Sequence, residues 1–559
     1  MIDAHEKPGN LIGIDLGTTY SSLCRLDERL HPVPIPNRED GELDLSDPTR
    51  FHSACQTPSV VFIDSEGEGV IVGRRAIKRG EKEPDRCIAN AKRFLSRKNS
   101  TWTIDGVSYT AVDVAAMIIR KLVGNAEKSI GPVSEAVVSV PAHFTAHQRK
   151  LTEEAALQAG LEKVSILNEP IAAALDYALG TAEDDGGVHM SEIVDDFTAL
   201  VFDLGGGTCD LAVIRYGTNE DHGLLEGVDS SSRQIRVVAS AGEPYLGGID
   251  WDLVLLQMLA ESFEAEYGID PRQSNSTMRS WVFEAEQCKC RLSDRAVDSE
   301  ASTVAYIDRE HIAVISRVEY ERRCEPLIAK AKHLTERLLQ SSGLTWKNID
   351  RIIPVGGSIR LPTVRDMIEE FAAQGPVIHE VPPDLAVAQG DAMYAGCQHY
   401  SGKGSRIAQA LGLRDLSGVD MSSVSGNDVG IVIVNGDGER VSHTLIPRNT
   451  ELPVTRTVKL ATKNPNQTRA SIRLTEGDWR PGAEDNCVCT CRIQDLPTNL
   501  PVNSRIEVEV TYGKDGLLEV LARHRDTGKT ASACVNFISD ADDLNILGGG
   551  DGLDSVGID

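Results

Sequence analysis

The stretch VFDLGGGTCDLAVI at residues 201–214 places three consecutive glycines behind an aspartate at the end of an apolar run. Apolar residues precede Asp203 and follow Asp210, so the pattern predicts two β-strands joined by a tight turn. Glycine allows such a turn to adopt positive φ and lets backbone N–H groups approach a ligand closely. The stretch therefore indicates a phosphate-binding hairpin, although an ordinary glycine turn has the same composition.

An earlier segment of the chain repeats this design. IGIDLGTTYSSLCRL at residues 12–26 has an apolar run, then Asp15, a leucine and Gly17, and then Thr18 and Thr19 before a second strand. Amides and hydroxyls suit phosphate oxygens, and carboxylates suit hydrated Mg²⁺. We expect the two hairpins to face each other across a cleft that holds one Mg²⁺–triphosphate.

A third glycine turn lies in IIPVGGSIRLP at residues 352–362, between an apolar strand and an amphipathic helix. The N-terminus of a helix after such a turn is a favourable place for nucleotide phosphates. Three glycine turns after apolar strands favour a nucleotide-binding protein over three unrelated turns.

Charge and length exclude several other classes of protein. The 559 residues carry a formal net charge of −27, which argues against nucleic acid as the main partner. There is no apolar run of about 18 residues and no apolar signal segment at the start, so we expect no membrane insertion and a cytoplasmic location. The length allows two to four domains.

Twelve cysteines are scattered along the chain, and we interpret them as reduced thiols. Cys487, Cys489 and Cys491 alternate on a predicted strand, and we favour buried strand cysteines over a metal or redox site there. Cys288 and Cys290 lie in a helical pattern and receive the same interpretation.

Strands and helices alternate from about residue 10 to 400, as in the strand at 135–141 and the amphipathic helix at 145–159. The hairpin-plus-helix pattern occurs twice, which predicts a duplicated α/β fold with the ligand between its halves. Acidic, glycine-rich stretches at 182–196 and 217–232 are predicted surface loops.

After residue 400 the pattern changes to short alternating strands separated by turn residues, which is typical of an antiparallel β-sandwich. The last segment is acidic and glycine-rich, without helical period, and predicts disorder. The expected domains are residues 1–400 (α/β nucleotide-binding domain), 401–420 (linker), 421–538 (β-sandwich) and 539–559 (disordered acidic tail).

Nine motifs follow one another from about residue 10 to 538: IGIDLGTTYS, AKRFL, VVSVPAHFTAHQRK, ILNEPIAAALDYAL, VFDLGGGTCDLAVI, LGGIDWD, EQCKCRLS, VGGSIRLP and LIPRNTELP. Their types and order resemble the seventy-kilodalton heat-shock chaperone family of the DnaK type. The resemblance implies an actin-like ATPase domain of two RNase H-like halves, a linker, and a β-sandwich that binds extended peptides.

The resemblance also implies the residues of an ATP site. Lys92 would orient the attacking water beside Glu169, and Asp210 would help to hold K⁺. From its own surroundings in the sequence, Lys92 would instead be a solvated helix lysine and Glu169 a helix-start carboxylate. The catalytic group is Lys92, Glu169, Asp203 and Thr208, and the metal group is Asp15, Asp203 and Asp210. The nucleotide group is Gly17, Thr18, Thr19, Tyr20, Gly205, Gly206, Gly207, Gly247, Gly248, Glu286, Lys289, Ser293, Gly357, Arg360 and Asp384.

Two further groups follow from the resemblance. Pro141 and Arg149 match a proline switch that reports nucleotide state to the sandwich. The positions expected to contact an apolar peptide side chain are Ile431, Val434, Leu460, Ala470 and Ile472. Alternation alone does not distinguish these five from core residues, so both interpretations stay open.

The sequence departs from the family pattern in several places. No long helical lid follows the sandwich, so we expect bound peptide to escape quickly. The nearest candidate for the acidic, leucine-rich linker is residues 413–420, which leaves stimulation by a J-domain partner and action of a nucleotide-exchange factor open. Cys290 stands where many members carry a second base-stacking arginine, so weaker nucleotide binding is expected.

The sequence thus predicts an ATP-hydrolysing chaperone that binds and releases apolar segments of client proteins. One alternative is a nucleotide-gated client-binding scaffold, and another is a small-molecule kinase of the same actin-like superfamily. A kinase would need an aspartate base in a substrate pocket and would have no use for a terminal sandwich.

Overall fold

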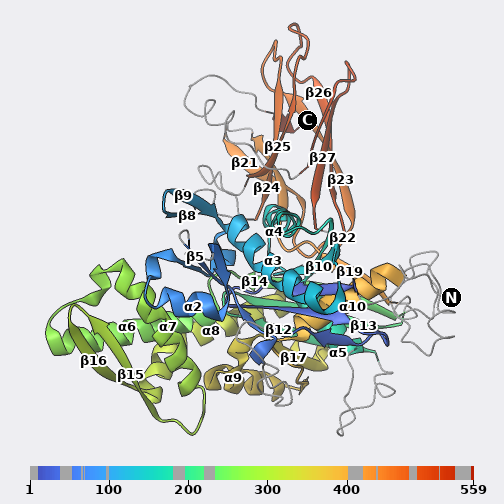
Figure 1. The fold of residues 1–559 in the computed structure, drawn as a ribbon. Helices are drawn as coiled ribbons and strands as arrows, with labels where there is room; N and C mark the ends of the chain where they lie inside the picture. The colour runs from blue at the N-terminus through green and yellow to red at the C-terminus, as the bar shows by residue number, and fades with distance from the viewer. Residues whose placement is uncertain are drawn as a thin grey trace. The chain divides into compact units, whose positions relative to one another are not determined.

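The structure is a computed structural model that describes residues 10–37, 53–64, 67, 69–95, 100–179, 196–218, 233–400, 419–435, 439–477, 487–514, 516–534 and 556–558 (Figure 1). Contacts divide the chain into two compact units. The first unit takes residues 1–142 and 152–421, and the second takes 143–151 and 422–559. Residues 143–151, which lie within the predicted α/β domain, thus group with the second unit.

Two sheets of the first unit have the same topology. In the first sheet the strands lie in the order β11 (Lys163–Asn168), β10 (Glu135–Val140), β1 (Ile12–Asp15), β2 (Tyr20–Leu26) and β3 (Pro32–Pro34), with β4 (Thr57–Pro58) also paired to β2. The corresponding strands of the second sheet are β18 (Val377–Ile378), β17 (Arg351–Val355), β12 (Phe197–Leu204), β13 (Cys209–Thr218) and β14 (Arg233–Glu243). In both sheets the first three strands are parallel and the last three are antiparallel neighbours. This repeated order is what a duplicated fold requires.

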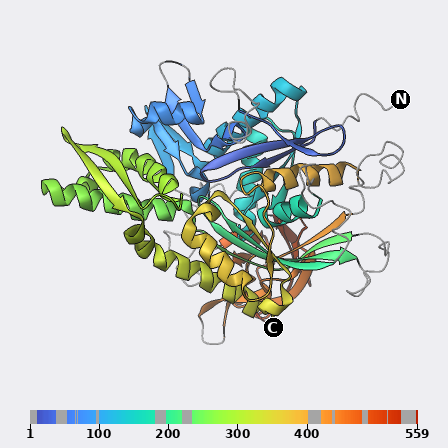
Figure 2. The same ribbon diagram turned by 90° about the horizontal axis from the view of Figure 1, so that it is seen from below.

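Two helices lie between these sheets, as Figure 2 shows. Helix α10 (Ala386–Tyr400) packs on β1 and β2, α5 (Glu169–Leu179) packs on β12 and β13, and the two helices pack on each other. Their close approach depends on Gly390, where an added Cβ would lie 1.8 Å from the carbonyl oxygen of Ala172. A side chain at Gly390 would therefore force the two halves of the unit apart.

The sheets are buried because their sequences are apolar on both faces. β12 reads FTALVFDL and is buried at seven of its eight positions, as expected for a central strand covered on both sides. The remaining helices are α2 (Arg74–Gly80), α3 (Ala111–Ile130), α4 (Ala146–Gln158), α6 (Gly248–Tyr267), α7 (Asn275–Leu292), α8 (Arg317–Ser341) and α9 (Pro362–Ala372). The smaller sheets contain β5 (Val60–Asp64), β6 (Gly69–Val72), β7 (Cys87–Ala89), β8 (Thr101–Ile104), β9 (Val107–Thr110), β15 (Ser299–Tyr306) and β16 (Arg309–Ser316). The 3₁₀ turns are η2 (Pro84–Arg86), η3 (Ala91–Phe94), η6 (Pro271–Gln273), η7 (Trp346–Asn348) and η8 (Gly357–Arg360).

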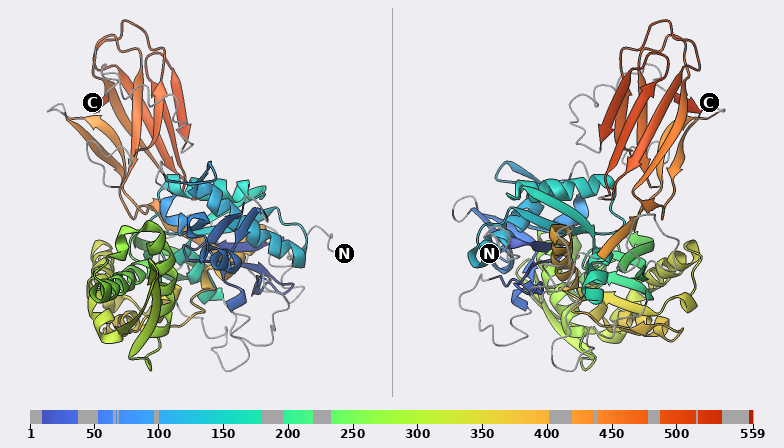
Figure 3. Two further views of the ribbon diagram at one scale, coloured as in Figure 1. Left: turned by 60° about the vertical axis from the view of Figure 1, so that its left-hand side comes forward. Right: turned by 90° about the vertical axis from the view of Figure 1, so that its right-hand side faces the viewer.

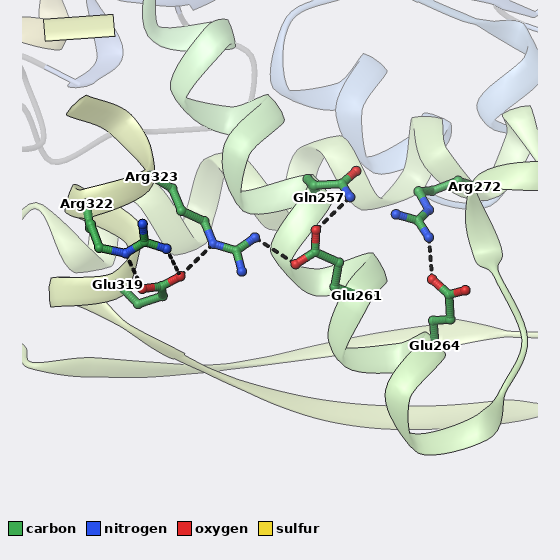
Figure 4. A network of polar contacts seen from close by, with 7 residues as sticks. All are labelled: Gln257, Glu261, Glu264, Arg272, Glu319, Arg322 and Arg323. Carbon is green, nitrogen blue, oxygen red and sulfur yellow. Dashed lines mark hydrogen bonds and ion pairs between the residues drawn. The ribbon is translucent and has the colours of Figure 1, made fainter. Parts of the chain in front are cut away.

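Exposed charges connect the helices at the periphery of the first unit (Figure 4). Arg323 of α8 donates to Glu261 of α6 at 2.7 Å, and Glu319 accepts from both Arg322 and Arg323 at 2.8 Å. Because these side chains are solvated, such pairs contribute little to stability and mainly keep α8 in one register on α6.

The second unit contains two antiparallel sheets that share one core (Figure 3). Their strand orders are β21–β20–β24–β25 and β28–β27–β26–β23–β29. β27 alternates strictly between buried and exposed residues, as expected for a sheet with one face on the core. The strands are β20 (Val429–Val434), β21 (Arg440–Ile446), β23 (Val454–Thr462), β24 (Ala470–Glu476), β25 (Cys487–Ile493), β26 (Arg505–Tyr512), β27 (Leu518–His524), β28 (Thr530–Cys534) and β29 (Val556–Ile558), with β19 (Val419–Val424) pairing to β22 (Glu451–Leu452).

Residues 556–558 depart from the prediction of a disordered tail. They form β29, which pairs with β23 in an antiparallel ladder, so disorder is the wrong description for these three residues. The remainder of the predicted tail from 539, the linker at 401–418, and most of the predicted loops at 182–196 and 217–232 lie outside the described residues. No helix in the described part of the chain is long and apolar enough to cross a membrane.

Candidate functional site: a nucleotide cavity

A cavity of about 350 Å³ in the first unit brings together nearly all of the residues predicted to bind nucleotide. The predicted residues in its lining are Asp15, Gly17, Thr18, Thr19, Tyr20, Lys92, Glu169, Asp203, Gly205, Gly206, Gly207, Thr208, Gly248, Glu286, Lys289, Ser293, Gly357, Arg360 and Asp384. They come from the ends and turns of strands in both sheets and from the helices and 3₁₀ turns packed around them. The cavity therefore lies between the duplicated halves, where the sequence predicted a ligand.

The two glycine hairpins face each other directly. An added Cβ at Gly206 would lie 2.0 Å from Thr19 Oγ1, and one at Gly207 would lie 2.3 Å from Thr18 Oγ1. Real Cβ atoms do not approach other atoms so closely, so both positions require glycine. The turn between β12 and β13 thus presents bare backbone to the hydroxyls of the β1–β2 turn.

The third glycine turn supports the second hairpin. Gly356 has φ of +86°, and a Cβ there would lie 2.4 Å from the carbonyl oxygen of Leu204. Ser358 Oγ donates to the carbonyl oxygen of Gly205 at 2.8 Å. The predicted order of strand, glycine turn and helix over 352–362 is confirmed by β17, η8 and α9.

The N-terminus of α6 holds the same hairpin from another side. The amides of Gly248 and Ile249 donate to the carbonyl oxygens of Gly205 and Gly206 at 3.0 and 2.8 Å. Gly247 does not line the cavity, because it packs behind Gly207, where an added Cβ would lie 2.5 Å from the Gly207 carbonyl carbon. Gly247 therefore lets α6 approach the turn closely.

Lys92 and Glu169 form a buried ion pair. Lys92 Nζ lies 2.7 Å from Glu169 Oε1, and the two residues are 8% and 7% exposed. Burial lowers the pKa of Lys92, but the charges of Glu169 and Asp15 act more strongly and raise it overall. The interpretation of Lys92 as a solvated helix lysine is therefore wrong, and its ammonium group remains charged inside the cavity.

The carboxylates beside this pair repel one another. Burial raises the pKa of Asp15 to about 7, with a further contribution from Glu169 and an opposing one from Lys92. Burial, together with Glu169 and Asp210, raises the pKa of Asp203 well above its usual range. Asp203 and Asp210 are direct cross-strand partners. One lysine does not balance this negative charge, so the site has the electrostatics that attract a divalent cation.

The donor set fits Mg²⁺ in its usual form. Within the described ranges, no group of three or more His, Cys, Asp or Glu side chains is arranged to hold a metal ion directly. Mg²⁺ normally keeps several waters and takes one or two carboxylates together with nucleotide phosphates. Asp15 and Asp203, which both line the cavity, suit that role. Asp210 is fully buried and does not line the cavity.

Charged residues at the opposite end of the cavity form two ion pairs. Arg360 pairs with Asp384, Nη1 lying 2.9 Å from Oδ1, and Lys289 pairs with Asp252 at 2.7 Å. Cys290 is exposed and lines the cavity, so its interpretation as a buried helix cysteine is wrong. Cys288 is buried, as that interpretation predicted. Cys290 and Arg360 therefore line the same cavity.

Arg93 is a residue of the site that the sequence interpretation missed. It donates through Nε and Nη2 to the carbonyl oxygen of Gly207 at 3.0 and 2.6 Å and pairs with Asp250 at 2.6 Å. Asp250 also accepts from the amide of Gly247 at 2.8 Å. The only signals were its place beside Lys92 in AKRFL and the acidic LGGIDWD motif, and neither reveals that the two segments meet.

The remaining predicted residues lie outside the cavity. Pro141 is in the first unit and Arg149 in the second, where its Nε donates to the carbonyl oxygen of Phe144 at 3.2 Å. Four of the five predicted peptide contacts, Ile431, Leu460, Ala470 and Ile472, are fully buried in the core of the sandwich, while Val434 is half-buried. This burial agrees with the open alternative that they are core residues.

Comparison with known proteins agrees with this geometry. A family profile described as Hsp70 protein matches residues 101–546. The chain belongs to the Hsp70 family. Relatives include "Chaperone protein DnaK" of Thermus thermophilus, 32% identical over 94% of this chain and 80% of the relative, and "Chaperone protein dnaK3" of Thermosynechococcus vestitus, 30% identical over 95% and 73%. "Chaperone protein DnaK" of Halobacterium salinarum is 31% identical over 95% and 75%.

Membership in the Hsp70 family establishes the general activity of this protein. It is an ATP-dependent chaperone that binds nucleotide, hydrolyses ATP and binds client polypeptides. The small-molecule kinase alternative is thereby set aside.

Proposed function

We propose that this Hsp70 hydrolyses the β–γ bond of Mg²⁺–ATP in the cavity between two actin-like halves, and that the reaction resets a peptide clamp formed by the sandwich. The proposal is supported most strongly by the two glycine hairpins, whose added Cβ atoms at Gly206 and Gly207 would lie only 2.0 and 2.3 Å from Thr19 and Thr18. Two facing turns of this kind can hold the same phosphate chain from opposite sides.

The phosphate chain rests on backbone amides and hydroxyls. The turn at Gly205–Gly207 offers N–H groups without side chains in the way, and Thr18, Thr19 and Thr208 offer hydroxyls. Asp15 and Asp203 would hold the hydration waters of Mg²⁺, which would offset the charge of the phosphates when it is bound. Asp210 would help to hold K⁺.

Lys92 and Glu169 act on the attacking water. The Lys92 ammonium is fixed by its 2.7 Å contact with Glu169, so it can orient a water in line with the γ-phosphate and stabilise the charge that develops on it. No strong general base stands beside the phosphates in this scheme. Positioning therefore carries the chemistry, and we expect slow turnover.

The nucleoside occupies the opposite end of the cavity. Glu286 and Lys289 take the ribose hydroxyls, Ser293 contacts the base, and Arg360 stacks on the base while held by Asp384. Cys290 supplies no second cation to stack, so the affinity for nucleotide is lower than in a site with two arginines.

The sandwich binds clients as extended strands, by backbone hydrogen bonds and an apolar pocket near Ile431, Leu460 and Ile472. Pro141 and Arg149 relay nucleotide state to it through the linker. A J-domain partner and a nucleotide-exchange factor regulate the cycle.

Peptide-release kinetics test the proposal. A labelled apolar peptide bound to the ADP form should leave faster after ATP is added, and Lys92→Met should keep this acceleration while losing hydrolysis. Identical release rates with and without ATP would favour the alternative of a client-binding scaffold without a working relay.

A further inference from the structure

The last strand of the chain lies on the sheet edge next to the predicted peptide site. β29 pairs with the edge of β23 in antiparallel register, with Thr462, Ala461 and Leu460 opposite Val556, Gly557 and Ile558. It also lies beside β20 and β24 of the other sheet.

These three neighbours of β29 carry all of the predicted peptide contacts. Ile431 and Val434 are on β20, Leu460 is on β23, and Ala470 and Ile472 are on β24. A segment of this chain therefore occupies the place between the two sheets where an apolar client strand is expected. Its sequence, Val-Gly-Ile, is apolar and uncharged, in contrast to the aspartates at 551, 554 and 559 on either side.

The edge of β23 is suited to such an addition. β23 is the last strand of its sheet before β29, so without β29 one side of its backbone would offer unpaired N–H and C=O groups. An extended segment that adds to this edge gains backbone hydrogen bonds whatever its sequence. The match with the family profile ends at residue 546, so β29 lies in a part of the chain outside that match.

We propose that residues 556–558 are an internal competitor for the client site: they add to the edge of β23 as a strand, and an apolar client segment displaces them by adding in the same antiparallel direction. This proposal rests on the proposed peptide-binding function of the sandwich. Tethering at a short distance gives the tail an effective concentration in the millimolar range, so even a weak strand occupies the edge for most of the time. Client segments that bind the edge of β23 tightly would displace residues 556–558, and client segments that bind weakly would not.

Three altered chains, each compared with the unaltered chain, test this competition with one probe, a fluorescein-labelled leucine-rich heptapeptide followed by anisotropy. The first ends after Ile546, the second is full-length Val556→Asp/Ile558→Asp, and the third is full-length Leu544→Asp/Leu547→Asp as a control with the same added charge outside β29. We expect the first two to bind the probe roughly tenfold more tightly than the unaltered chain and the third to be unchanged. A free peptide of residues 550–559 should compete with the probe on the shortened chain.

The outcomes separate the two proposals. Equal, measurable affinity of the full-length and shortened chains would overturn the competition and leave client binding intact. Failure of every chain to bind the probe, with cooperative unfolding retained, would overturn the peptide-binding function and the competition together. Amide hydrogen exchange at Ala461 gives a second readout, because its N–H faces β29 and should exchange faster in the shortened chain and slow again when the probe is added. The amide of Thr462, which donates to the carbonyl oxygen of Ser504 at 3.0 Å, serves as an internal control.

Discussion

Replacement of Lys92 by methionine removes the charge that we place beside the γ-phosphate and keeps most of the side-chain volume. Lys92 and Glu169 are both more than nine-tenths buried and 2.7 Å apart, so the change leaves Glu169 without its cation. Loss of one partner from a buried pair costs about 3–5 kcal/mol when the other charge stays ionised. We therefore expect the free energy of unfolding to fall by a few kcal/mol.

The effect on catalysis is larger than the effect on binding. A charged donor aimed at developing transition-state charge is worth roughly a hundredfold to a thousandfold in rate, or about 3–4 kcal/mol. Lys92→Met should therefore reduce the single-turnover rate of ATP hydrolysis by at least a hundredfold, while the affinity for Mg²⁺–ADP changes by less than about fivefold, since ADP lacks the phosphate that Lys92 serves.

The assay combines single-turnover hydrolysis, calorimetric ADP binding and thermal unfolding on four chains: unaltered, Lys92→Met, Glu169→Gln and the double variant. The double variant carries no lone buried charge, so it should recover much of the stability lost by Lys92→Met without recovering its rate. If folded Lys92→Met that binds Mg²⁺–ATP still hydrolysed it at a third of the normal rate or faster, the assignment of Lys92 to the reacting water would be refuted.

Three further predictions concern the cavity. The pKa of Asp15 is about 7, and its protonated form is a poor partner for hydrated Mg²⁺. The affinity for Mg²⁺–ADP should therefore rise about tenfold from pH 6 to pH 8, as measured by calorimetry in matched buffers. An affinity that does not change with pH would argue against Asp15 at the metal. Gly206→Ala should weaken ADP binding at least tenfold, because the added methyl group would collide with Thr19. The control is Gly124→Ala in α3, where an added Cβ meets nothing within 4 Å. This control should leave ADP binding unchanged and raise the melting temperature slightly. Cys290→Arg should strengthen ADP binding about fivefold by stacking opposite Arg360, and unchanged affinity would show that the base does not rest there.

The sequence predicts the strands and turns of the nucleotide cavity well, because local patterns determine them. The short apolar runs that end in Asp15 and Asp203 favour strands because glycine turns follow them directly, and these glycines mark turns that approach a ligand closely. The repeated order of strands in the two sheets follows from the same patterns.

Contacts between distant segments are harder to infer from the sequence. Lys92 has the local sequence of an exposed lysine, and only its approach to Glu169, 77 residues away, buries it. Arg93 joins two motifs that the sequence shows separately. β29 was missed because its three residues have too little length to show a strand period and depend on the edge of β23 for their conformation.

The most direct test of the shared phosphate site is amide hydrogen exchange over residues 17–20 and 205–208, measured across a titration with Mg²⁺–ADP. We predict that exchange slows at both turns and that the two effects have the same midpoint, because one ligand contacts both. Slowing at only one turn, or at two clearly different nucleotide concentrations, would contradict the claim that the two hairpins close on the same polyphosphate.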